Sequence, residues 1–131
     1  SPQALKNTFY HGSLHQPKAF EILKNAHIVL FPSFGENFSM ALLEVMALGR
    51  ITITSSIPSF REVIIDYENG FIANDESEYI ERIDYIFKTK NINSIKVKAY
   101  NTVKVRFNNR NIVLDNIKYY ESIMNKKNIF V

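Results

Sequence analysis

The most constraining feature of this 131-residue chain is a short apolar stretch, residues 40–48, that carries a helix signal at each end. Ser39 precedes the stretch and Gly49 follows it, and these are residue types that begin and end helices. Within the stretch only Glu44 is polar. A helix that is apolar all round is normally buried, and a carboxylate on it is costly unless a partner or ligand compensates it. The pattern therefore predicts a buried helix over residues 39–48 and singles out Glu44 as a candidate functional residue.

The segment before this helix has the features of an anion-binding loop. Residues 28–31 are β-branched, apolar and aromatic, and Pro32 closes the run, which predicts a short strand. Gly35 lets the backbone approach a ligand closely, and Glu36 supplies a second carboxylate. The helix N-terminus after a parallel strand presents free amides and the positive end of the helix dipole, which together suit a phosphate. The stretch thus offers two carboxylates for hydroxyl groups on either side of a phosphate-binding helix end.

Residues 36–44 read Glu-Asn-Phe-Ser-Met-Ala-Leu-Leu-Glu, two glutamates separated by seven residues. This pattern resembles the signature of the retaining glycosyltransferases of family 4, or glycosyl transferases group 1, which have the GT-B fold. The flanks are similar as well, because residues 32–33 are Pro-Ser and residues 44–49 read Glu-Val-Met-Ala-Leu-Gly. Asn37 and Ser39 stand where the family usually has glycines, and both residue types tolerate a tight turn before a helix.

The resemblance implies a role for each part of this stretch. Glu44 would accept hydrogen bonds from the ribose hydroxyls of a nucleotide-diphospho-sugar, and the amides of Met40 and Ala41 would hold its distal phosphate. Glu36, the candidate catalytic residue, would hold hydroxyls of the donor sugar and stabilise an oxocarbenium-like transition state. The neighbouring residues expected to contact the donor sugar and phosphate are Asn37, Phe38 and Ser39. The alternative is that Glu44 is an ordinary buried carboxylate satisfied by a neighbouring group and that Glu36 is a surface loop residue.

Elsewhere the chain offers fewer candidates. The resemblance places the nucleotide base near a loop that contains Gly12, Ser13 and Leu14. Glu62 matches a glutamate that the family has before an Asn-Gly turn, and it is either structural or part of the pocket rim. The three histidines lack the spacing of metal ligands, so we expect no metal, and no cofactor, because the nucleotide-diphospho-sugar is the substrate.

Strand patterns alternate with helix patterns, which indicates an α/β fold with a Rossmann-like parallel sheet and flanking helices. The expected strands are residues 8–10, 28–31, 51–54 and 71–73. The expected helices are residues 17–25, 39–48, 60–67, 76–88, 95–106 and 111–124. Ligands of such sheets bind beyond the carboxyl ends of the strands, so the loops at residues 12, 33–39 and 55–59 should converge on one edge.

The resemblance covers residues 8–120, which correspond to only the second half of the C-terminal, donor-binding domain of the family. The first half of that domain has two strands, with a Gly-Arg loop and a lysine that face the donor phosphates. In the usual strand order this pair lies between the strands at residues 8–10 and 28–31. We therefore expect an apolar sheet edge or an incomplete sheet, so that the chain dimerises, exchanges elements or belongs to a longer polypeptide. Residues 1–131 would form a single partial nucleotide-sugar-binding domain, with residues 94–131 as its C-terminal helical extension.

The function that the resemblance implies is the donor-binding part of a retaining hexosyltransferase in bacterial surface polysaccharide or lipopolysaccharide synthesis. Its partners would be the nucleotide-sugar, a saccharide or lipid-linked acceptor, and a missing N-terminal domain or a second copy of the chain, but no nucleic acid. The chain alone is expected to be inactive. The alternatives are a catalytically inactive nucleotide-sugar-binding or interaction module and, third, a related sugar-nucleotide epimerase. The chain has no cysteine and a net charge of +3, and we expect it in the cytoplasm or peripherally at the inner membrane.

Overall fold

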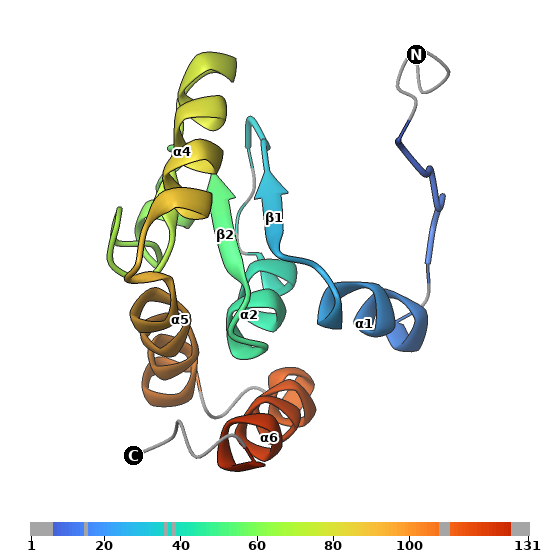
Figure 1. Ribbon diagram of the computed structural model, residues 1–131. Coiled ribbons are helices and arrows are strands. Elements are labelled where there is room, and N and C mark those ends of the chain that lie inside the picture. Colours follow the sequence, from blue (N-terminus) through green and yellow to red (C-terminus); the bar gives the residue numbers. More distant parts are fainter. Residues whose placement is uncertain (1–6, 15, 36, 38, 108–110, 127–131) are drawn as a thin grey trace.

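The computed structural model describes residues 7–14, 16–35, 37, 39–107 and 111–126 (Figure 1). The elements follow in the order α1 (Gln16–Lys24), β1 (Ile28–Phe31), α2 (Met40–Ala47), β2 (Ile51–Thr54), α3 (Pro58–Arg61), β3 (Phe71–Ile72), α4 (Glu76–Lys88), α5 (Ile92–Arg106) and α6 (Asn111–Lys126). This is the expected α/β fold, in which helices flank a small parallel sheet. None of the described helices is both long enough and apolar enough to cross a membrane.

The sheet has three parallel strands in the order β1-β2-β3. Ile28 lies opposite Ile51 and Phe31 opposite Thr54, so β1 and β2 pair along their whole length. The shorter β3 pairs only with the carboxyl-terminal half of β2. All three strands therefore end on the same side of the molecule, where the loops to α2, α3 and α4 begin.

Each face of the sheet has its own hydrophobic cluster. On one face Ile51 and Ile53 of β2 pack with Phe71 and with Ile86 of α4. Successive strand residues point to opposite faces, so Thr52 and Thr54 face the other side, where α2, α5 and α6 lie. The core of that side consists of Leu42, Leu43, Met46, Ala47, Phe60, Val63, Ile64, Ala99, Tyr100, Val103, Ile117 and Tyr120. Helix α2 is thus enclosed between the sheet and two further helices.

Helix α2 has the caps that the sequence predicts. The Ser39 hydroxyl accepts a hydrogen bond from the Leu42 amide at 3.2 Å, and Ser39 itself has extended backbone. Gly49 has a φ of 64°, the left-handed conformation that ends many helices. The predicted strands at residues 28–31 and 51–54 and the predicted helix at residues 76–88 are likewise confirmed.

The predicted strand at residues 8–10 is wrong, because these residues form no strand in the structure. Phe9 and Tyr10 are 83% and 85% exposed, so they pack against little else. A strand requires a neighbour for its backbone hydrogen bonds, and residues 8–10 pair with no strand in the described part of the chain. Their composition favours a strand, but the structure supplies no partner.

The bounds of α1, α2 and β3 differ from the prediction by one residue, and those of α3, α5 and α6 differ by more. The helix expected at residues 60–67 is only α3, because the Asn69 side chain accepts a hydrogen bond from the Ile65 amide and donates one to the Val63 carbonyl. These are backbone groups that a longer helix would use. Helix α5 begins earlier than expected, at Ile92, and α6 extends to Lys126.

Gly49 should be essential for packing α6 against α2. A Cβ at this position would overlap the Tyr120 ring, and the positive φ disfavours any L-residue. We expect Gly49→Ala to lower the free energy of unfolding by about 2–4 kcal/mol, the combined cost of left-handed backbone and overpacking. Urea denaturation followed by circular dichroism measures this change.

Gly35→Ala is the matched control, because a Cβ there meets no described atom within 4 Å and the backbone has no positive φ. It should stay within about 0.5 kcal/mol of the parent chain, as is usual for surface substitutions. Equal losses in the two variants would contradict the assigned packing of Gly49.

Candidate functional site

The loops that follow β1 and β2 are joined at the carboxyl edge of the sheet. The Ser55 amide donates a hydrogen bond to the Phe31 carbonyl at 3.0 Å, which extends the sheet by one residue. The Ser55 hydroxyl donates to the Ser33 carbonyl, so it fixes the start of the loop that leads to α2. The predicted convergence of these two loops is therefore confirmed. Sequence reasoning assigned Ser55 only to a loop and missed this bridging role.

The N-terminus of α2 presents free backbone donors beside this junction. The Ser39 hydroxyl accepts a hydrogen bond from the Leu42 amide, and the Ser39 carbonyl accepts one from the Leu43 amide at 3.4 Å. The amides of Met40 and Ala41 precede the first intrahelical hydrogen bond and have no acceptor among the described residues. Ala41 is exposed, so this end of the helix is open to a ligand. The first turn of α2 contains no acidic residue.

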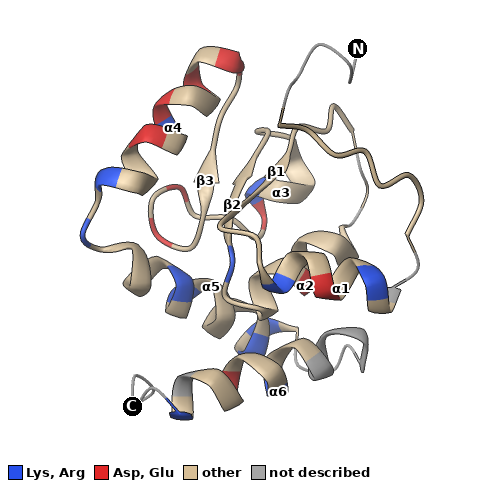
Figure 2. Cartoon of the chain, turned by 45° about the vertical axis from the view of Figure 1, so that its right-hand side comes forward, with Lys and Arg blue, Asp and Glu red and all other residues tan. Residues whose placement is uncertain are grey.

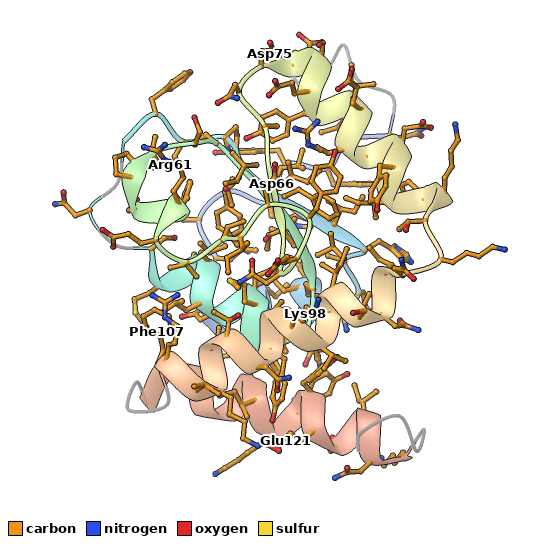
Figure 3. All side chains as sticks on the ribbon, turned by 90° about the vertical axis from the view of Figure 1, so that its left-hand side faces the viewer. Arg61, Asp66, Asp75, Lys98, Phe107 and Glu121 are labelled. Atoms are coloured by element: carbon orange, nitrogen blue, oxygen red, sulfur yellow. The ribbon has the colours of Figure 1, made fainter. Side chains whose placement is uncertain are left out.

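Helix α4 provides an internal comparison, because it too begins at the carboxyl edge of the sheet, directly after β3. Its cap residue Asp75 accepts a hydrogen bond from the Glu78 amide, and Glu78 accepts one from the Asn74 amide. Carboxylates of the chain thus already occupy the positive end of this helix. In Figure 3, Asp75 at the start of α4 and Arg61 of α3 lie toward one end of the molecule, and Glu121 of α6 lies toward the other. Of the two helix ends, only that of α2 is closed by a neutral cap, Ser39.

Glu44 lies on the one side of α2 that is not buried. Its half-buried side chain stands three residues after the exposed Ala41, so both project from the same side of the helix. Burial raises the pKa of the Glu44 carboxyl above its ordinary value. The Asn116 side chain of α6 donates a hydrogen bond to the Glu44 backbone carbonyl at 2.9 Å, and this bond ties this turn of α2 to α6.

The loop between β1 and α2 holds the remaining candidates. Phe34 is fully exposed, and Asn37 is exposed as well. Nothing in the described protein requires a glycine at residue 35, because an added Cβ would have open space. Glu36 and Phe38 lie outside the described residues, so their predicted contacts with the donor sugar stay predictions. The exposed Phe34 adjoins these positions and was not among the sequence candidates.

The remaining predicted residues belong to segments outside the two loops that Ser55 joins. Gly12, Ser13 and Leu14 are exposed in the segment before α1, and no hydrogen bond in the described chain joins them to the loops at Ser33 and Ser55. Their contact with a nucleotide base stays a prediction. Glu62 is exposed, and its carbonyl accepts a hydrogen bond from Arg106 at 3.0 Å.

Two further features of the described residues bear on the site. The Tyr79 hydroxyl of α4 donates a hydrogen bond to the Phe31 carbonyl at 3.4 Å. Sequence reasoning missed this contact because Tyr79 belongs to an ordinary amphipathic helix pattern.

A shallow pocket lies apart from α2, between α5 and the turn after α3. Its lining residues include Ile65, Asn69 and Lys98. Within the described chain, no three His, Asp or Glu residues are grouped as a metal site would require.

Comparison with known proteins identifies the chain as a member of the glycosyl transferases group 1 family, whose model matches residues 3–102. It is 31% identical over 121 residues to an uncharacterized glycosyltransferase of Methanocaldococcus jannaschii, which covers 89% of this chain and 31% of the relative. The chain therefore spans only about a third of the length of this curated relative.

Solved structures show the same fold. The C-terminal domain of a glycosyl transferase group 1 family protein, LpcC, from Francisella tularensis superposes with a TM-score of 0.63 at 21% identity. That match covers 76% of this chain and 51% of the solved domain. HepE from Anabaena, solved in complex with UDP-glucose, superposes with a TM-score of 0.61 at 17% identity and covers 81% of this chain and 29% of HepE. The fold is thus that of a GT-B C-terminal domain, of which the three parallel strands form a part.

The raised pKa of Glu44 makes a prediction for stability. The folded chain holds this proton more tightly than the unfolded chain, so it binds more protons from the ordinary pKa of 4.5 up to the raised value. Relative to Glu44→Gln, the parent chain should therefore lose stability as the pH rises through this window. Urea unfolding of both proteins across pH 4–8, with Glu81→Gln of the exposed face of α4 as the control, tests the sign. An advantage of the parent over Glu44→Gln that grows with pH would contradict it.

Proposed function

We propose that this chain is the donor-binding part of a retaining glycosyltransferase that moves a hexose from a nucleotide-diphospho-sugar to an acceptor. The observation that carries the proposal is the pairing of two features on α2. The free amides of Met40 and Ala41 lie at the N-terminus of α2, and the half-buried Glu44 stands one turn further along the exposed side of the same helix. This arrangement suits a ligand with an anionic group and a diol a few ångströms apart, which is the chemistry of a nucleoside diphosphate.

In the proposed complex the distal phosphate lies on the α2 N-terminus, where the amides of Met40 and Ala41 donate to its oxygens. The positive end of the helix dipole stabilises the negative charge that grows as the nucleotide diphosphate departs. Ionised Glu44 accepts hydrogen bonds from the ribose hydroxyls. Glu44 is partly shielded from water. Its hydrogen bonds to the ribose should therefore be stronger than those of a fully exposed carboxylate.

Glu36 is proposed to hold hydroxyls of the donor sugar and to stabilise positive charge on the ring as the glycosidic bond to phosphate breaks. The acceptor oxygen then bonds to the face of the anomeric carbon that the diphosphate has left, and the acceptor proton passes to the departing diphosphate, so that the configuration is retained. The assignment of Glu36 rests on the pattern in which seven residues separate it from Glu44. Support for a nucleotide-sugar comes from HepE, a structural neighbour solved with UDP-glucose.

The complete reaction requires more polypeptide than these 131 residues. The curated relative is about three times as long, which leaves room for an acceptor-binding domain and for the cations that face the donor phosphates. We propose that the chain works with such a domain, on a saccharide or lipid-linked acceptor of bacterial surface polysaccharide or lipopolysaccharide. We place it in the cytoplasm, with peripheral contact to the inner membrane. Figure 2 shows basic residues on α5 and α6, the surface that would face anionic lipid.

A second candidate is a nucleotide-sugar-binding module without transferase activity. The observation that favours it is that the described features of the site, the amides of Met40 and Ala41 and the Glu44 carboxylate, would bind a nucleotide without acting on the sugar. Both candidates predict nucleotide binding at α2. They differ in whether a chain extended upstream, with an acceptor domain, transfers sugar.

The first test is calorimetric titration of UDP, GDP, ADP and their hexose conjugates against the parent chain and Glu44→Ala. We expect one nucleotide to bind and Glu44→Ala to weaken its binding by about 1–3 kcal/mol, or roughly 5–150-fold, as for a lost charged hydrogen bond. Glu81→Ala, which removes an exposed carboxylate from α4, should leave the affinity unchanged. Absence of nucleotide binding both in this chain and in one extended upstream would overturn the proposal.

A further inference from the structure

The loop between β1 and α2 is held by one serine hydroxyl near each of its ends. At its start, the Ser55 hydroxyl donates a hydrogen bond to the Ser33 carbonyl. At its end, the Ser39 hydroxyl caps the first turn of α2. Ser33 and Ser39 are both half-buried, whereas the described residues between them, 34–35 and 37, are exposed. The loop thus has two fixed points, and its described residues between these points contact solvent.

The Ser55 hydroxyl takes the place of a hydrogen bond of the sheet. In a parallel sheet the hydrogen bonds are evenly spaced, so alternate residues of a strand bond to the same neighbour. The Phe31 carbonyl accepts from the Ser55 amide at 3.0 Å, so the next carbonyl on that side is that of Ser33. The chain after β2 turns into α3 at Pro58, and no backbone amide of the described residues donates to Ser33. The Ser55 side chain supplies this donor and thereby fixes where the loop leaves the sheet.

The two halves of the proposed donor site depend on different supports. The amides of Met40 and Ala41 and the carboxylate of Glu44 belong to α2, which packs against the sheet, α5 and α6. Glu36 instead belongs to the loop whose start the Ser55 hydroxyl holds. Loss of this hydroxyl would therefore leave the nucleotide half of the site in place, because close-packed helices do not follow a surface loop. Only the half that meets the sugar would lose its support.

We infer that Ser55 is a positioning residue of the donor site, which acts through the Ser33 carbonyl to orient the loop that binds the donor sugar. It strengthens binding of the hexose and leaves binding of the nucleotide to α2. The Ser55 hydroxyl proton is used on Ser33, so this residue acts through the loop and not on the sugar itself. The inference rests on the proposed function, because it takes Glu36 and its loop as the part that meets the hexose.

The test compares UDP with UDP-glucose, GDP with GDP-mannose and ADP with ADP-glucose by calorimetry, on this chain or, where it binds none of them, on the chain extended upstream. For the pair that binds, Ser55→Ala should weaken binding of the sugar conjugate by roughly 3–10-fold, the usual effect of one lost hydrogen bond. The affinity for the nucleotide itself should change by less than about twofold, because the supports of α2 are independent of Ser55. Ser55→Thr, which keeps a hydroxyl, should keep both parent affinities.

Ser122→Ala is the matched control. The Ser122 hydroxyl also donates to a backbone carbonyl, that of Tyr119 at 2.7 Å, but this bond lies within α6. Both affinities should therefore stay at their parent values in this variant. Equal losses for the nucleotide and its sugar conjugate in Ser55→Ala, or a loss of the same size in Ser122→Ala, would overturn the inference.

A measurement without ligand separates this inference from the proposed function. In ¹⁵N relaxation, the amides of Gly35 and Asn37 should show larger fast motions in Ser55→Ala than in the parent. The amides of Met40 and Ala41 should be unchanged. If neither this chain nor the extended one binds a nucleotide, the proposed function fails together with the role of Ser55 toward a sugar. The relaxation data decide separately whether Ser55 holds the loop, and unchanged loop amides in Ser55→Ala would overturn that role.

Discussion

Burial of α2 on nearly every side is the constraint on which the rest of this structure depends. The sheet covers one side of the helix, and α5 and α6 cover most of the others. Gly49 allows Tyr120 to approach the end of the helix, and Asn116 holds the Glu44 carbonyl. A helix fixed at this many points cannot shift along its axis without opening the core, because protein interiors are close-packed. The position of its N-terminus at the sheet edge is therefore set by packing far from any ligand.

The same burial leaves only a narrow strip of α2 accessible to solvent. Only the side with Ala41 and Glu44 is open, so the proposed ligand would approach the helix from that side. The helix end at α4 shows the opposite solution, in which Asp75 and Glu78 neutralise the dipole and leave nothing for an anion. Two helices that begin at one edge of a small sheet thus differ in the charge at their N-termini, and only the α2 end leaves the helix dipole uncompensated by carboxylates of its own cap.

Sequence reasoning predicted the parts that local chemistry decides. The caps at Ser39 and Gly49 and the helix at α4 follow from residue types at fixed offsets, and the structure confirms them. It failed at residues 8–10, where β-propensity predicts a strand but pairing depends on a neighbour distant in sequence. It also missed the Ser55 bridge and the Tyr79 contact, because both depend on the sheet register. Glu44 was singled out because a charge on an apolar helix is anomalous, whereas the exposure of Phe34 had no signal in the sequence.

The measurement that tests the central claim most directly is a titration of the ¹⁵N-labelled chain with UDP, followed by two-dimensional NMR. If the α2 N-terminus is the phosphate site, the largest amide shifts should fall on Met40, Ala41 and Glu44, and inorganic phosphate should reproduce those of Met40 and Ala41. Saturable shifts centred instead on Ile65 and Asn69, in the pocket beside α5, would contradict the account.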